Sequence, residues 1–101
     1  PNAARQVTPQ LIINVVAEHF GITPEDITSK KRNSEFVQPR QICMYLCRKL
    51  TDESLQTIGK ALGKKDHTTV IHGFDKITYE VANSEEMRNK IDIIKKKINP
   101  S

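Results

Sequence analysis

Apolar residues recur along this chain three or four positions apart, which is the spacing of a helix and not the alternation of a strand. Leu11, Ile12, Val15 and Val16 form one such stripe within residues 9–20. Further helices are predicted: a short one after Thr23-Pro24, one over residues 40–50 and one over residues 55–62. A fifth is capped by Asp66 and carries Val70, Phe74, Ile77 and Val81, and a sixth starts at Ser84 and carries Ile91, Ile94 and Ile98. No alternating segment is long enough to indicate a strand. The pattern therefore predicts an all-α fold, a compact bundle of about six helices.

Residues with helix-starting and helix-ending preferences separate these stripes. The expected starts are Thr8-Pro9, Thr23-Pro24 with Asp26 completing a capping box, Pro39, Ser54, Asp66 and Ser84, and the expected ends include Gly21 and Gly63. Residues 29–34 have no apolar period and are predicted to form a loop. Residues 1–6 are interpreted as a linker tail and residues 7–101 as one domain. Because the chain opens with Pro1, we expect a fragment of a longer protein.

Composition excludes several classes of protein. The net charge of +4 permits a polyanionic partner, and two cysteines do not make a disulfide framework, so we expect a cytoplasmic protein. No apolar run approaches the ~20 residues that span a bilayer. Cys43 and Cys47 lack the usual zinc-ligand spacing, so no metal is expected. Residues 59–65 lack the spacing and the hydroxyl residue of a phosphate-binding loop. With no set of nucleophile, base and acid visible, we expect no enzyme.

The fourth and fifth predicted helices are joined only by Gly63-Lys64-Lys65, which indicates a helix-turn-helix. The fifth helix opens with Asp66, His67 and Thr68, although Thr and His are poor helix formers. In a recognition helix these side chains would project into the DNA major groove and contact base edges. The alternative is that Asp66 is only an N-cap and Thr69 only its partner at the third helical position.

A second basic site is the predicted loop around Lys30, Lys31 and Arg32. A flexible basic loop beside a helix-turn-helix can enter the adjacent minor groove, as a homeodomain arm does. Arg40 and Gln41, at the predicted start of the third helix, are placed to hold phosphates. The alternative is that the three charges form ordinary solvated surface.

Two segments carry a family resemblance: PRQICMYLCRKLT and, after it, SLQTIGKALGKKDHTTVIHGFDKI. Together they resemble the C-terminal DNA-binding domains of the bacterial DnaA replication initiators, from about Val7 to Ile98. The pairing of Pro-Arg-Gln with a downstream Asp-His-Thr-Thr-Val is highly specific. The resemblance implies a Trp-repressor-like helix-turn-helix that binds double-stranded DNA at replication-origin boxes resembling TTATCCACA and positions the initiator for origin opening.

The resemblance also implies roles for individual residues. Arg32 would insert into the minor groove, and Asp66, His67 and Thr68 would contact base edges in the major groove. The DNA backbone would be contacted by Lys30, Lys31, Arg40, Gln41, Arg48, Leu55, Gln56, Lys64, Lys65, Thr69 and His72. In that family ATP binding belongs to a separate, preceding ATPase domain, so no cofactor is expected of these residues.

This sequence departs from the family pattern at a few positions. Lys64 replaces the second glycine of the turn, so the turn should avoid a positive φ there unless it is strained. Lys65 replaces an arginine, which keeps the charge but loses the bidentate fork. Gly73 replaces an alanine and costs roughly 1 kcal/mol unless close packing requires it. Ser34-Glu35 stands where basic or neutral residues are common, which reduces the expected contribution of the loop.

The alternative function is a protein-interaction module. Lys95-Lys96-Lys97 lies beside Ile91, Ile94 and Ile98, so the last predicted helix is basic and amphipathic. Such a helix can bind acidic phospholipids or a regulatory protein, unless its apolar face folds onto the domain. With no zipper in the sequence, we expect the isolated domain to be a monomer.

Overall fold

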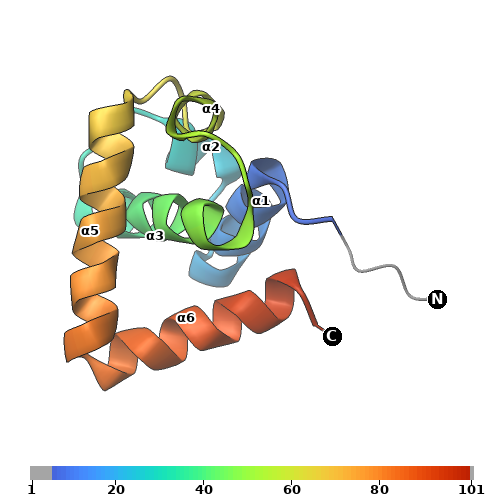
Figure 1. Cartoon of the computed structure of the whole chain (residues 1–101), viewed down its shortest axis with the longest axis vertical. Helices are drawn as coiled ribbons and strands as arrows, with labels where there is room; N and C mark the ends of the chain where they lie inside the picture. Colours follow the sequence, from blue (N-terminus) through green and yellow to red (C-terminus); the bar gives the residue numbers. More distant parts are fainter. Residues whose placement is uncertain (1–5, 101) are drawn as a thin grey trace.

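The computed structural model describes residues 6–100, which form six α-helices and no strand (Figure 1). The helices are α1 (Pro9–Phe20), α2 (Pro24–Thr28), α3 (Ser34–Leu50), α4 (Leu55–Ala61), α5 (His67–Asn83) and α6 (Glu85–Ile98). The predicted all-α class is confirmed. None of the described helices is long and apolar enough to cross a membrane. Of the predicted linker tail, residues 1–5 lie outside the described residues.

Local capping explains where most of the helices begin. The side chain of Thr8 accepts a hydrogen bond from the N–H of Leu11 at 3.1 Å, and Thr23 and Asp26 form both bonds of the predicted capping box. Ser54 and Ser84 accept from the third helical N–H in the same way. Each bond satisfies an N–H group that has no partner within the helix. These helix starts are confirmed.

The prediction that Pro39 opens the third helix is wrong, because α3 begins at Ser34 and Pro39 lies inside it. The N–H groups of Phe36 and Val37 already bond to the carbonyl of Asn33 at 2.8 and 2.9 Å. Proline has a helical φ but no N–H, so within a helix it removes one backbone hydrogen bond. Here the proline ring is buried, so its packing in the core offsets the lost hydrogen bond. The loop before α3 therefore ends at residue 33.

Helix α3 lies at the centre of the bundle and packs against α1, α2, α4 and α5 (Figure 1). Its buried residues include Ile42, Cys43, Leu46 and Cys47. Burial raises the pKa of the Cys47 thiol to about 12 and also raises that of Cys43, which keeps both in the neutral form. The two cysteines therefore act as small core residues.

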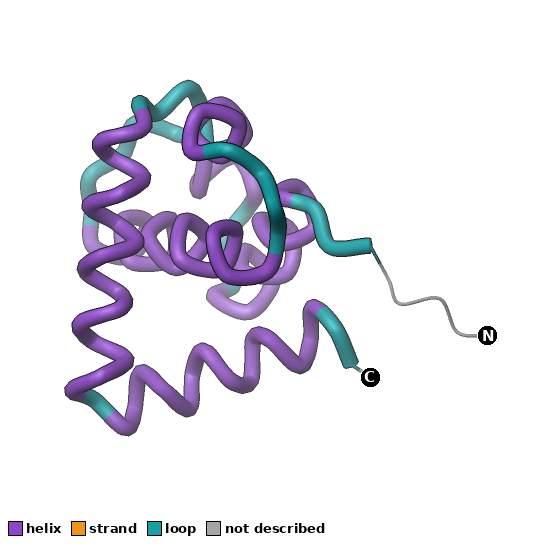
Figure 2. The backbone as a smooth tube through the Cα atoms, viewed as in Figure 1, coloured by secondary structure: helices purple, strands orange, loops and turns teal. Residues whose placement is uncertain are grey.

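Helix α6 leaves the end of α5 and runs back beneath α1 and α3, as the backbone trace in Figure 2 shows. It packs on α5 and α1 through Met87, Ile91, Ile94 and Ile98, all of which are buried. The apolar face that the sequence predicted for this helix is thus part of the core. A free amphipathic helix, as the interaction-module alternative requires, is not observed.

The α4–α5 turn contains a strained residue. Gly63 has a φ of 90° and Lys64 a φ of 65°, a region that side chains with a Cβ rarely adopt. Lys64 therefore carries the strain that its replacement of glycine implied. By contrast, Gly73 lies where α5 packs closely on α3, because a Cβ there would overlap the sulfur of Met44 and that side chain would have to shift. The close packing that the sequence analysis named as a reason for glycine at position 73 is therefore present.

Candidate nucleic-acid interface

The first turn of α5 presents its polar side chains to solvent. Asp66, His67 and Thr68 are all exposed, while Val70 and Ile77 on the opposite face are fully buried. The geometry follows from the helical period, which places residues three or seven positions apart on one face. One face of α5 therefore anchors the helix in the core, and the other is free to contact a partner.

Asp66 acts as the N-cap of α5. Its Oδ1 accepts a hydrogen bond from the N–H of Thr69 at 2.9 Å, and this bond is the main cause that lowers the pKa of the carboxyl below its ordinary value. The carboxylate is ionised at neutral pH and has further acceptor positions beyond the cap. Capping and base contact are therefore compatible roles for this residue.

A basic hollow lies beside the start of α5, between the α2–α3 loop, α3 and the α4–α5 turn. It brings together residues from four separate parts of the sequence: Lys30, Arg32, Arg40, Gln41, Lys64, Lys65, Thr69 and His72. A second hollow, which shares Lys64 and Lys65 with the first, is lined by Gln56, Lys60, Lys64, Lys65, Asp66 and His67. Most of the residues expected to contact DNA therefore share one continuous surface.

Lys60 is a residue of this surface that sequence reasoning missed. It is exposed on α4 and lines the second hollow together with Asp66 and His67. The only signal was its position one turn before the lysines of the α4–α5 turn. The sequence could not show which face of α4 meets the turn.

Some of the expected contacts lie outside the two hollows. Arg48 is exposed on the last part of α3, with its guanidinium 5.1 Å from the centre of the Phe74 ring on α5. Leu55 is half-buried at the start of α4 and packs against the core. Lys31 forms an ion pair with Asp26 at 3.0 Å. Each of these three residues therefore has a contact within the fold and does not line either hollow.

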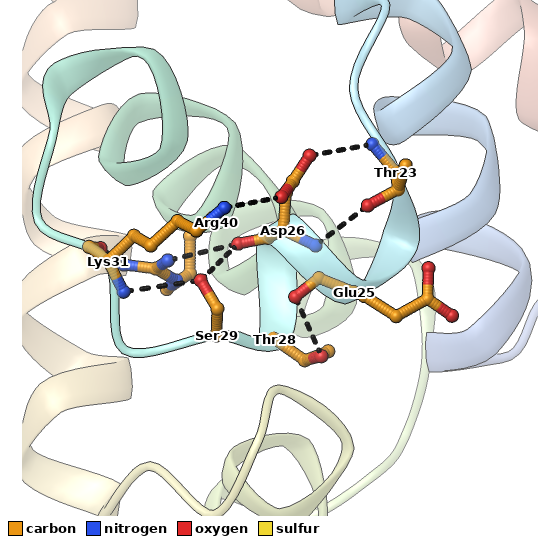
Figure 3. A network of polar contacts seen from close by, with 7 residues as sticks. All are labelled: Thr23, Glu25, Asp26, Thr28, Ser29, Lys31 and Arg40. Atoms are coloured by element: carbon orange, nitrogen blue, oxygen red, sulfur yellow. Dashed lines mark hydrogen bonds and ion pairs between the residues drawn. The ribbon is translucent and has the colours of Figure 1, made fainter.

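Arg40 has a set of partners that its sequence position did not reveal. Only 6% of the residue is exposed, and its guanidinium donates to the backbone carbonyls of Ile27 at 2.6 Å, Lys31 at 3.0 Å and Asp26 at 3.3 Å. Figure 3 shows the side chain reaching from α3 toward the end of α2 and the following loop. Burial lowers the pKa of Arg40 from its ordinary value. The residue lines the basic hollow with much of its side chain already engaged.

Lys65 joins the α4–α5 turn to the same loop. Its Nζ donates to the carbonyl of Ser29 at 2.9 Å, across 36 positions of sequence. Burial, and then the charges of Arg40 and Lys30, lower the pKa of this amine. The side chain therefore spans the space between the basic loop and the residue that caps α5.

Comparison with known proteins places this chain in a family. A family model described as the bacterial DnaA protein helix-turn-helix matches residues 9–77. The chain is 46% identical over 101 residues to the chromosomal replication initiator protein DnaA of Lachnoclostridium phytofermentans, which is 100% of this chain and 22% of that protein. It is 45% identical over 97 residues to the protein of the same name from Caldanaerobacter subterraneus subsp. tengcongensis, which is 96% of this chain and 22% of that protein.

A solved structure described as a DNA replication initiation factor has the same fold. It matches with a TM-score of 0.79 and 36% identity, over 89% of this chain and 27% of that chain. This chain thus spans only 22% of the length of the DnaA relatives above. The match of the family model, the identity to these relatives and the shared helical fold agree: the chain belongs to the bacterial DnaA helix-turn-helix family.

Proposed function

We propose that this domain binds double-stranded DNA sequence-specifically at replication-origin boxes of the TTATCCACA type. The observation that carries the proposal is the exposed tip of Asp66, His67 and Thr68 beside a basic hollow. A helix tip of this size fits the major groove, and the hollow offers the positive charge that a phosphate backbone attracts. The membership of the DnaA family supports the same assignment.

In this proposal α5 is the recognition helix. The carboxylate of Asp66 accepts from a cytosine amino group, while the His67 ring and the Thr68 methyl pack on thymine methyl groups. Arg32, exposed in the α2–α3 loop, enters the adjacent minor groove, where a narrow A·T-rich groove attracts arginine. The two grooves are then contacted from two different segments of one rigid domain.

Phosphate contacts set the register of the protein on the duplex. The residues proposed for this role are Lys30, Lys31, Arg40, Gln41, Arg48, Leu55, Gln56, Lys64, Lys65, Thr69 and His72, and we add Lys60 because it lines the second hollow. These contacts supply affinity that falls with salt, but they carry no sequence information themselves.

The relatives are initiator proteins, so the proposed role of the domain is to place an initiator at its origin for opening. ATP binding is proposed for another part of such a protein, and no catalytic step is assigned to these residues. One domain binding one asymmetric box as a monomer is sufficient for this role. A lipid or protein partner at α6 has less support, because the apolar face of that helix is buried.

A fluorescence titration with box and scrambled duplexes at two salt concentrations tests the proposal. We expect the box to be preferred by at least ~10³-fold at fixed salt, with affinity for both duplexes falling as salt rises. His67→Ala or Thr68→Ala should reduce the preference by ~1–3 kcal/mol and leave scrambled binding nearly unchanged. Thr78→Ala, an exposed threonine further along α5, is the matched control. Equal losses on both duplexes would contradict base contact.

A further inference from the structure

The segment that carries Lys30, Lys31 and Arg32 is a loop held by two long cationic side chains from elsewhere in the fold. Residues 29–33 form no helix of their own: the N–H of Ser29 bonds to the carbonyl of Asp26, the N–H of Lys31 bonds to the Ser29 hydroxyl, and only the carbonyl of Asn33 belongs to the first turn of α3. Four carbonyls of this region, those of Asp26, Ile27, Ser29 and Lys31, accept from Arg40 or Lys65. Backbone carbonyls near a core need such donors.

Arg40 satisfies the end of α2 and the middle of the loop at the same time. Asp26 and Ile27 lie in the last turn of α2, where carbonyls lack a partner within the helix, although that of Asp26 also accepts from the N–H and the hydroxyl of Ser29 at 3.4 and 2.8 Å. One rigid guanidinium bonds to both of them and also to the carbonyl of Lys31, the residue just before Arg32. Within residues 6–100 no carboxylate forms an ion pair with Arg40. Its charge is therefore directed at backbone, and the planar fork suits several acceptors at once.

Lys65 makes the connection to α5. It immediately precedes Asp66, and its Nζ bonds to the carbonyl of Ser29, the residue just before Lys30. The two segments also touch directly, because a Cβ on Gly63 would overlap the carbonyl oxygen of Thr28. The start of α5 and the start of the basic loop are thus joined by one side chain and by one close backbone approach.

We infer that Arg40 and Lys65 are positioning residues that fix Arg32 relative to Asp66, His67 and Thr68. The inference rests on the proposed function, since it assigns the two side chains to spacing the minor-groove loop from the major-groove helix. A loop held in place before binding avoids the entropy of ordering it on the DNA. For Arg40 this role replaces the phosphate contact proposed above, and the two roles predict different results.

The first test needs no DNA. Trypsin cleaves after Lys30, Lys31 and Arg32, and mass spectrometry locates the cuts in the folded domain. Arg40→Lys keeps the charge but loses the fork, and Lys65→Met removes the bond to Ser29 while keeping an apolar stem. We expect each variant to raise the cleavage rate in this loop about tenfold. Losing hydrogen bonds to a charged group increases the population of the open loop by about this factor. Arg48→Lys, on the same helix, is the matched control and should leave loop cleavage unchanged.

The second test is a double-mutant cycle on the box duplex. Arg40→Lys should weaken box binding about tenfold in the native sequence and less than about twofold when Arg32 is already alanine, because its effect passes through Arg32. Arg48→Lys combined with Arg32→Ala is the reference pair: for an independent phosphate contact, the fold-losses in box affinity of the two single variants should multiply in the double variant. Circular dichroism melts establish that every variant is folded at the assay temperature.

The outcomes separate the two ideas. Unchanged loop cleavage together with equal Arg40→Lys losses in both backgrounds would overturn the inference and make Arg40 a direct phosphate contact. If the native domain showed no preference for its box, the proposed function would fail. The cleavage result would still decide whether Arg40 and Lys65 hold the loop.

Discussion

One side chain in this domain both stabilises a helix and belongs to the surface proposed to contact DNA. Asp66 is both the N-cap of α5 and part of the exposed tip, so one carboxylate satisfies the helix and remains available to a partner. Its capping role was evident in the sequence, because a cap depends on residues three positions away. The partners of Arg40 were not evident, because they lie 9 to 14 positions away and on the backbone. Every residue has a backbone carbonyl, so the sequence does not indicate which carbonyls accept from Arg40.

His19 provides a pH-dependent test at the residue scale. Its Nδ1 lies 3.0 Å from Nζ of Lys97 where α1 meets α6, and burial, followed by the charges of Lys97 and Lys90, lowers its pKa from 6.5. The unfolded chain therefore takes up a proton at a higher pH than the folded domain does. By linkage, the contribution of His19 to the free energy of unfolding is fully present above pH 6.5 and is lost as the pH drops below it.

Thermal melts at pH 7.5 and pH 5 measure this effect. We expect the native domain to melt at a lower temperature at pH 5, and His19→Gln to remove part of that difference. Asp26 and Asp66 have pKa values lowered from 3.8, so their contributions change only below this window. An identical pH dependence in the variant would show that the Lys97–His19 contact does not govern the titration.

At the scale of elements, the α4–α5 turn stores backbone strain. Lys64→Gly should raise the free energy of unfolding by about 1 kcal/mol, because glycine adopts the φ of 65° without steric conflict. Lys64→Ala removes the same charge but keeps the strain, and it should leave stability nearly unchanged. Gly63→Ala should be destabilising by more than about 1 kcal/mol, because its Cβ would meet the Thr28 backbone. Urea unfolding without DNA measures all three, and equal stabilities for the glycine and alanine variants at position 64 would contradict the strain.

Helix starts were predictable where a capping residue is followed by the stripe, as at Thr8, Thr23, Ser54, Asp66 and Ser84. The start of α3 was not predictable, because Asn33 makes no side-chain capping bond and Pro39 gave a stronger but misleading signal. In this helix tertiary burial of the proline outweighs the local preference. The candidate surface inherits that error in two places: the loop is shorter than predicted, and Arg40 and Gln41 lie inside α3 and not at its start.

At the scale of the whole molecule, apolar periodicity showed which face of each helix is buried but not which helices meet. The sequence predicted the apolar stripe of α6, yet it left open whether that stripe binds a partner or folds back. The structure shows it packed on α1 and α5, at the end of α5 opposite the exposed tip of Asp66, His67 and Thr68 (Figure 1). The order of helices was therefore predictable, whereas their assembly around α3 required the structure.

Two adjacent isoleucines of α6 test this arrangement. Ile94 is fully buried and Ile93 is 50% exposed, so Ile94→Ala should lower the free energy of unfolding by ~2–5 kcal/mol and Ile93→Ala by less than ~1 kcal/mol. Because α6 lies away from the start of α5, both variants should keep the native preference for box over scrambled DNA while they remain folded. Urea unfolding gives the stabilities, and the two-duplex titration gives the preference. A loss of box preference in Ile93→Ala, at unchanged stability, would show that the outer face of α6 takes part in binding and would return the interaction-helix alternative to consideration.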